Sequence, residues 1–145
     1  MFLSKELKIV DAITIAAGAA GSSAVNGAAL DTANAESVLV EVKTGPIVSG
    51  AVTSIKWQEG DAANLSDAAD VAGTSQTIAD DADNQIFYIN IEKPRKRYGR
   101  VVVSRATQNA TVTATYFVGG NRVVPVTQGS GVQGETHVSP AIGTA

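Results

Sequence analysis

The strongest chemical signal in the sequence is a run of five cations within eight residues, nearly half of the eleven lysines and arginines of the chain. They are Lys93, Arg95, Lys96, Arg97 and Arg100. The preceding stretch, residues 59–83, contains seven acidic residues and no basic one. Because arginine pairs bidentately with carboxylates, we predict that the basic loop 93–100 is a protein-contact element. Its acidic partner would lie on a neighbouring molecule or within the same chain.

Phosphate binding is an alternative use for the same cations, because lysine and arginine neutralise phosphates and Tyr98 could stack on a base. The chain has a formal net charge of −3 at pH 7, and the basic cluster is confined to one loop. A nucleic-acid-binding protein typically presents a broader basic surface. A solvated hairpin loop is the other alternative. We expect no nucleic-acid partner and prefer the protein contact.

Residues suited to catalysis or metal binding are sparse. The chain has no cysteine, and its single histidine, His137, lies in a Gly/Ser-rich stretch. Thiolate chemistry is therefore excluded, and a catalytic base on such a stretch would be poorly positioned. Residues 80–84, Asp-Asp-Ala-Asp-Asn, offer the oxygen ligands that Ca²⁺ prefers but do not match the EF-hand motif. We interpret them as a solvated acidic turn, with an assembly contact as the other alternative. We predict no enzyme activity, no cofactor and no metal.

The composition predicts a surface that other molecules cover. Charged residues make up 17% of the chain, whereas about 25% is typical of soluble domains. A surface of small neutral residues is typical of one buried in an assembly. We expect self-association, with a dimer favoured and a trimer possible. No apolar run approaches the roughly 18 residues of a membrane span, and Glu6 and Asp11 interrupt the one stretch that resembles a secretory signal. We expect no membrane partner.

Alternation of apolar and polar residues predicts strands along most of the chain. They span residues 7–15, 36–43, 51–57, 85–92, 100–105, 111–118 and 122–126. The predicted core contains Val40, Val42, Ile55, Phe87, Ile89, Val101, Val103, Val112 and Tyr116. Short turn-forming stretches between several strands favour antiparallel pairing, and one turn of helix is expected within 61–71. The sequence therefore predicts an all-β, antiparallel two-sheet sandwich that is jelly-roll-like.

Two low-complexity stretches, 18–34 and 127–145, are rich in glycine, serine and alanine. Alone, such a composition cannot bury enough apolar area to offset the entropy lost on ordering. We therefore expect extended arms that neighbouring molecules hold in place. The predicted organisation is an N-terminal strand and arm over 1–34, a β-sandwich domain over 35–126 and a tail over 127–145.

Four segments together resemble small structural proteins of tailed phages. They are VLVEV (38–42), AVTSIKW (51–57), RYGRVVV (97–103) and ATYFVGG (114–120). In that group a V-x-V strand leads to a strand that ends in an aromatic residue and an acidic loop, and a K-R-Y-x-R-V strand precedes the last hairpin. The resemblance covers about residues 36–120. It implies a bacteriophage capsid cement (head decoration) protein of the jelly-roll type, which binds major capsid protein on the exterior of the virion.

Two other classes of protein share the expected fold. A carbohydrate-binding or tail-fibre module would stack sugar rings on exposed aromatic side chains. The chain has one Trp, three Tyr and three Phe, and the core needs most of them. A hydrolase on a β-scaffold would need carboxylates that converge on a cleft. The structural role therefore remains the preferred prediction.

Overall fold

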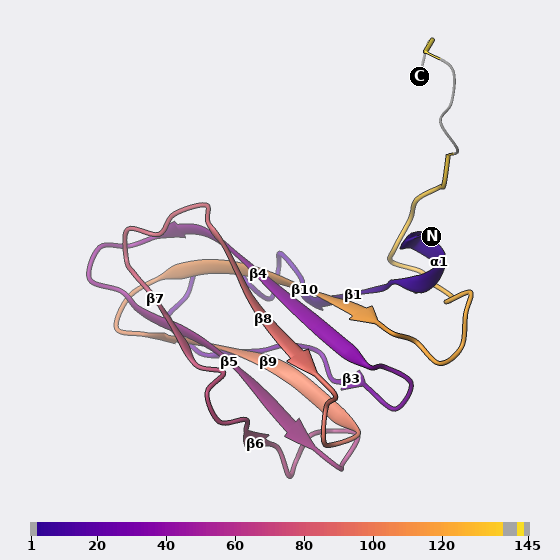
Figure 1. The fold of residues 1–145 in the computed structure, drawn as a ribbon. Coiled ribbons are helices and arrows are strands. Elements are labelled where there is room, and N and C mark those ends of the chain that lie inside the picture. The colour runs from indigo at the N-terminus through magenta and orange to yellow at the C-terminus, as the bar shows by residue number, and fades with distance from the viewer. Residues whose placement is uncertain (1–2, 138–141, 144–145) are drawn as a thin grey trace.

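The computed structural model describes residues 3–137 and 142–143, which form one short helix and ten strands. The helix is α1 (Leu3–Glu6), and the strands are β1 (Lys8–Ile13), β2 (Val25–Asn26), β3 (Leu30–Asp31), β4 (Ser37–Ile47), β5 (Val52–Gly60), β6 (Ala69–Asp70), β7 (Gln76–Ile78), β8 (Ile86–Glu92), β9 (Tyr98–Ala106) and β10 (Ala110–Gly119). They form two antiparallel sheets packed face to face (Figure 1). The predicted all-β sandwich is confirmed.

The strand order identifies the sandwich as a jelly roll. The first sheet has the order β1-β10-β4-β8, and the second is built around the pair β9-β5. Both β2 and β3 pair with β9, and both β6 and β7 pair with β5, so each couple takes the place of one interrupted strand. If each couple is counted as one strand, the sandwich has eight strands. Numbered in chain order, these eight strands lie in the order 1-8-3-6 in the first sheet and 2-7-4-5 in the second. This is the jelly-roll arrangement of two interleaved Greek keys.

The core lies between the sheets, where each strand places every second side chain. Every predicted core residue is buried except Phe87, which is half-buried and packs against the core. At its centre, Trp57 and Tyr116 meet edge to face with ring centroids 5.7 Å apart. The Tyr116 hydroxyl accepts from the backbone N–H of Val101 and donates to the carbonyl of Ala28, so this core residue also fastens the arm that carries β2 and β3.

The N-terminal arm, predicted to need a neighbour, is held by the chain itself. The guanidinium of Arg105 is buried and donates to the carbonyl oxygens of Ala19 (2.6 Å), Ser23 (2.8 Å) and Ala110 (2.8 Å). Desolvation by burial lowers the pKa of Arg105 below its ordinary value. An unpaired buried cation thus serves as a clamp on backbone carbonyls. The glycine-rich composition of the arm does not predict this contact, because Arg105 lies far away in the sequence.

Three predicted elements differ from the structure. Residues 122–126 form no strand; Val123 and Val124 are exposed, and the Val126 N–H donates to the Lys5 carbonyl. Residues 61–68 form turns and bends in place of helix, because the Asp67 carboxylate accepts from the backbone N–H groups of Asp61 and Ala62, and the strand β6 follows at Ala69–Asp70. These two hydrogen bonds close a loop between Asp61 and Asp67, and the closed loop is incompatible with a helix over the same residues.

The predicted strand over 7–15 is shorter than expected. β1 ends at Ile13, and a bulge between Asp11 and Ile13 shifts its pairing with β10. Beyond the bulge, Ile15 is 82% exposed and leaves the predicted apolar face. A bulge moves later side chains out of period, so the alternation fails after it.

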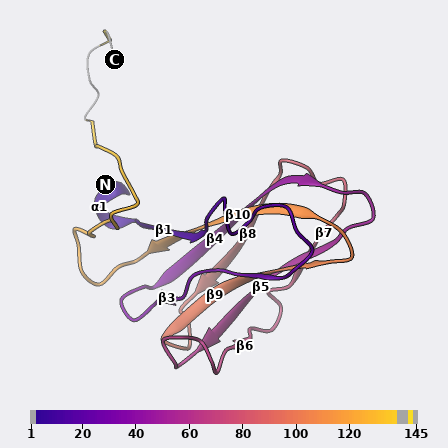
Figure 2. The same cartoon turned by 180° about the vertical axis from the view of Figure 1, so that it is seen from behind.

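The two terminal segments lie together beyond one end of the sandwich. Figures 1 and 2 show α1 beside the segment that follows β10, with the C-terminal arm projecting away from both sheets. Hydrogen bonds from Asn121 to the Glu6 carbonyl and between Ser4 and Thr136 join the two segments. No helix in the described part of the chain is long and apolar enough to cross a membrane.

Candidate protein-binding site at the basic end of the sandwich

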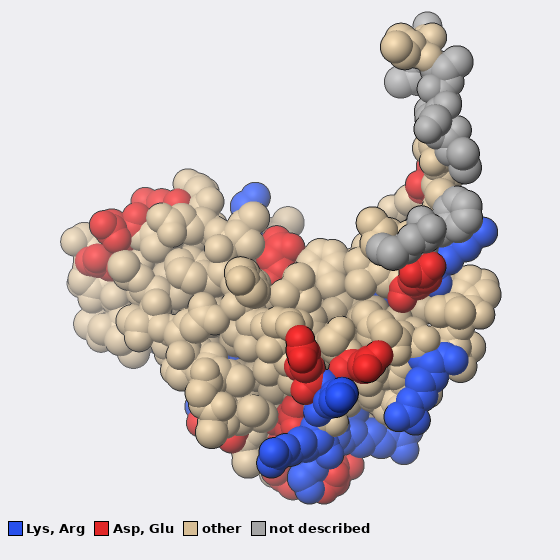
Figure 3. All heavy atoms as spheres, viewed as in Figure 1, with Lys and Arg blue, Asp and Glu red and all other residues tan. Residues whose placement is uncertain are grey.

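The basic loop connects the two sheets at one end of the sandwich. β8 ends at Glu92 and β9 begins at Tyr98, so residues 93–97 form the connection and Arg100 lies within β9. Lys93, Arg95, Lys96 and Arg97 are exposed, whereas Arg100 is half-buried. Figure 3 shows lysine and arginine side chains gathered at this end, with carboxylates among them. All five predicted residues therefore lie in one region.

A buried carboxylate fixes the backbone of this loop. Glu59, only 8% exposed, accepts hydrogen bonds from the indole Nε1 of Trp57 (3.0 Å) and from the backbone N–H groups of Arg95 (3.2 Å) and Lys96 (3.3 Å). The Lys93 N–H donates to the Glu36 carbonyl at 2.7 Å. Hydrogen bonds therefore hold the loop backbone at Lys93 and again at Arg95 and Lys96.

Three of the five predicted cations are already bound within the chain. Lys96 pairs with Asp61 at 2.6 Å, and Arg97 pairs with Asp31 at 3.0 Å. The hydrogen bond from Arg97 holds the pKa of Asp31 below its ordinary value, and Asp61 raises the pKa of Lys96. Arg100 donates from Nε to the Gln58 side chain at 3.0 Å.

The predicted pairing between the basic loop and the acidic stretch 59–83 therefore occurs within one chain, through the side chain of Asp61 and the buried carboxylate of Glu59. Asp31, the partner of Arg97, lies outside that stretch. Sequence reasoning missed it because β3 belongs to the low-complexity arm.

Three exposed cations at this end have no partner in the described part of the chain. They are Lys93, Arg95 and Arg122, which we call the cation cluster; their side chains form no hydrogen bond or ion pair with a described residue. Arg122 reaches this end because its backbone N–H donates to the Asn34 carbonyl at 3.0 Å. It lines a shallow hollow of about 450 Å³ with Lys93 and Pro94. A neighbouring hollow of about 480 Å³ lies beside Lys93 and Arg95.

The sequence does not indicate Arg122 as part of this site, because its alternation predicts a separate strand over residues 122–126. The turn at 119–121 carries the signal that could have found it. This turn reverses the chain at the end of β10, and in an antiparallel sandwich that end lies next to the connection between β8 and β9.

The cation cluster suits a partner that carries carboxylates and hydrogen-bond donors. Glu36 and Glu92 line a third hollow together with Lys93, so the cations are interspersed with negative charge. A phosphate backbone would meet repulsion from these carboxylates, whereas a protein surface of mixed charge can pair with both signs. Within the described residues, no group of three or more His, Cys, Asp or Glu side chains is arranged to hold a metal.

The acidic turn at 80–84 stabilises the fold at the opposite end. The Asp83 carboxylate accepts from the Ile47 N–H at 2.7 Å, and the Asp80 carboxylate accepts from the Gly50 N–H. The Thr44 hydroxyl donates to the Ala82 carbonyl at 2.7 Å. These contacts tie the turn between β4 and β5 to the segment that precedes β8, so two of the three aspartates already have backbone partners.

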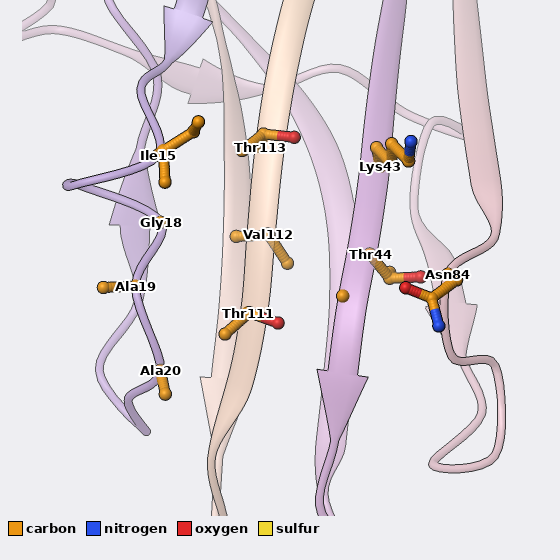
Figure 4. Close-up of a pocket in the computed structure, with 11 residues that line it drawn as sticks. Ile15, Gly18, Ala19, Ala20, Lys43, Thr44, Asn84, Thr111, Val112 and Thr113 are labelled. Carbon is orange, nitrogen blue, oxygen red and sulfur yellow. The ribbon is translucent and has the colours of Figure 1, made fainter.

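The remaining candidate places carry little chemistry. His137 is exposed and lies 3.5 Å from the Glu135 carboxylate within the C-terminal arm. A hollow of about 380 Å³ lies between the N-terminal arm and the first sheet (Figure 4). Ile15 and Ala19 line it on one side and Thr113 and Lys43 on the other, and Lys43 is its one charged side chain. Neither place brings together an acid, a base and a nucleophile.

No protein-family model matches the chain, and a search of curated proteins finds no match.

Proposed function

We propose that the chain is a non-catalytic structural protein of a bacteriophage particle, which decorates and cements the capsid exterior by binding major capsid protein. The cation cluster carries this proposal, because Lys93, Arg95 and Arg122 are exposed and lack partners in the described part of the chain. The jelly-roll topology and the resemblance over residues 36–120 support it. The partner surface is acidic, and the location is the outside of the virion.

The anchored loop favours this contact energetically. Glu59 and the Glu36 carbonyl hold the loop backbone before a partner arrives, so less conformational entropy is lost on binding. Exposed ion pairs contribute only about 0.2–1 kcal/mol each. A symmetric shell repeats the contact at every equivalent site, and an oligomer of this chain adds avidity. Ion pairs that each contribute little free energy then add up to stable binding of the protein to the shell.

Self-association belongs to the same proposal, with a dimer favoured over a trimer. Ile86 (61% exposed) and Tyr88 (64% exposed) present apolar surface on the outer side of β8, next to Leu39 on β4. Their cross-strand neighbours on β4 are Lys43 and Glu41, so this side combines apolar groups with charges of both signs and is suited to contact with protein.

The alternative, a carbohydrate-binding or tail-fibre module, has weaker support. Trp57 and Tyr116 are buried in the core, and Phe87, Tyr98 and Phe117 are half-buried. Tyr88 is the one mostly exposed aromatic side chain among the described residues. Within the described part of the chain, no second exposed aromatic ring lies beside Tyr88 to complete a surface on which sugar rings could stack.

Co-sedimentation with empty, expanded heads assembled from major capsid protein tests the proposal. The triple variant Lys93→Ala, Arg95→Ala, Arg122→Ala removes the cation cluster. The control Lys56→Ala, Lys96→Ala, Arg97→Ala removes the same charge, but from side chains paired with Asp70, Asp61 and Asp31. We expect the first variant to bind about 3- to 100-fold more weakly, with the difference depending on salt, and the control to stay close to wild type.

Three results would overturn the proposal. The first is a wild-type chain that does not bind heads, and the second is a cluster variant that binds as well as wild type at every salt concentration. The third is tight binding of wild type to DNA with a steep salt dependence, which would make phosphate the partner.

A further inference from the structure

β1 is an edge strand whose outer side is partly open. Its one partner strand is β10, and near its end the Ala12 carbonyl accepts from the Ala28 N–H of the N-terminal arm at 2.8 Å. In an antiparallel pair, alternate residues direct their N–H and C=O groups to the partner strand and away from it. The Ile9 N–H and the Leu7 carbonyl both bond away from β10, so the next residue in this series, Asp11, also faces the open side. Such an edge can template pairing with another strand.

A side chain from the C-terminal arm occupies part of this edge. Gln128 accepts from the Ile9 N–H through Oε1 (2.9 Å) and donates from Nε2 to the Leu7 carbonyl (2.7 Å). A residue in a parallel strand would make the same two bonds on either side of Lys8. The primary amide of Gln128 thus takes the place of a peptide group in a parallel ladder.

Neighbouring contacts hold this amide in position. The Val126 N–H donates to the Lys5 carbonyl at 2.7 Å, and Asn121 donates to the carbonyls of Glu6 (2.8 Å) and Val118 (2.9 Å). The segment 121–128 therefore runs along the start of β1 as a strap. Beyond Gln128, a hydrogen bond between Thr136 and Ser4 also joins the arm to the start of the chain.

The part of β1 beyond the strap is self-complementary. If two copies pair antiparallel about Val10, Ile9 of each lies opposite Asp11 of the other, and both residues direct backbone groups outwards. This register sets Val10 against Val10, a favourable β-branched pair, and places Lys8 opposite Ala12, so no like charges face each other. The pairing requires the Ile9 N–H, which Gln128 holds.

We propose that the β1 edge is a strand-pairing surface for β1 of a second copy, and that Gln128 closes this surface within each chain. The inference is independent of the proposed capsid function. Release of the strap would open the edge, and self-association through β1 would follow. Association through the outer face of the first sheet would leave Gln128 in place.

The test uses the full chain with Gln128→Glu. A carboxylate can accept from the Ile9 N–H, but it cannot donate to the Leu7 carbonyl and would repel it. Gln133→Glu, on the same arm at an exposed position, is the control with the same change in charge. We expect hydrogen exchange at the Ile9 amide to be about tenfold faster in Gln128→Glu, because the bonds from Nε2 to the Leu7 and Ser4 carbonyls are lost, and unchanged in the control.

A single cysteine reports the pairing, because the chain has none of its own. In the proposed register, Val10→Cys brings two thiols opposite each other at a separation that suits a disulfide. We expect Val10→Cys to cross-link several-fold faster when Gln128→Glu is also present, and Lys8→Cys not to respond.

Either of two results would overturn the inference. Unchanged exchange at Ile9 in Gln128→Glu would show that the amide does not close the edge. Faster exchange without cross-linking at Val10→Cys would show that a second copy is not the partner.

Discussion

The carboxylate of Glu59 accepts a hydrogen bond from the indole of Trp57 at 3.0 Å and, on its other oxygen, from the backbone N–H of Arg95 at 3.2 Å. Trp57 and Glu59 lie two residues apart on the same face of β5, so the strand aims both side chains inwards. The packed core thereby sets the position of an exposed basic loop.

Replacement of Glu59 by glutamine tests this link. An amide can accept from Trp57, but its NH₂ group faces the donors of Arg95 and Lys96 and leaves them unsatisfied. We expect the free energy of unfolding to fall by about 1–3 kcal/mol and the two amides to exchange faster. Chemical denaturation and hydrogen exchange measure both effects. Asp61→Asn, which removes an exposed ion pair with Lys96, should cost less than about 1 kcal/mol; equal losses would contradict the anchoring role.

Gly99→Ala should destabilise the protein through the core. A Cβ atom at this position would lie 2.1 Å from Cζ2 of Trp57, and the fully buried indole has no room to move. Overpacking of this kind typically costs about 1–3 kcal/mol. Gly131→Ala is the matched control, because nothing lies within 4 Å of its added Cβ atom. Thermal unfolding of both variants checks the prediction, which fails if their midpoints agree.

Arg105→Lys should loosen the N-terminal arm. A single ammonium cannot reach the carbonyls of Ala19, Ser23 and Ala110 with the geometry of the guanidinium fork. We expect a loss of about 1.5–3 kcal/mol and faster proteolysis between residues 16 and 24. Arg100→Lys, where one bond joins half-buried Gln58, should leave proteolysis of the arm unchanged. An arm equally resistant in Arg105→Lys would show that β2 and β3 hold it without the clamp.

The pair formed by Asp31 and Arg97 should respond to acid. Arg97 lowers the pKa of Asp31, so its folded value lies below its unfolded value. The contribution of the pair to stability is therefore complete above the ordinary aspartate pKa of 3.8 and is lost as the pH falls through the lowered value. Arg97→Gln should raise the pKa of Asp31 towards 3.8, as an NMR titration of its carboxyl carbon would show. An unchanged titration would assign the shift to the other donor, the backbone N–H of Ala33.

The strands of the sandwich could be predicted because their burial follows a period of two. Val40 and Val42 alternate with Leu39 and Glu41, and the structure buries the two valines completely. β2 and β3 escaped prediction because they are two residues long and owe their position to pairing with β9. Pairing between distant segments leaves no local period in the sequence.

The candidate site was predictable only in part. The cations of the basic loop are adjacent in sequence, so their clustering was visible, but the sequence did not show which of them are already paired. Asp31 and Arg122 reach this end of the sandwich through the course of the chain. Glu59 had the appearance of one more surface acid, and only its place beside Trp57 reveals its role.

The acidic turn before β8 and the cation cluster after it stand at opposite ends of one strand. Seven residues at about 3.3 Å each separate them by roughly 23 Å, more than twice the screening length of about 8 Å at physiological ionic strength. A charged group that meets the cation cluster is therefore screened from the carboxylates of the acidic turn, and changes at one end of β8 leave the electrostatics of the other end nearly unaltered.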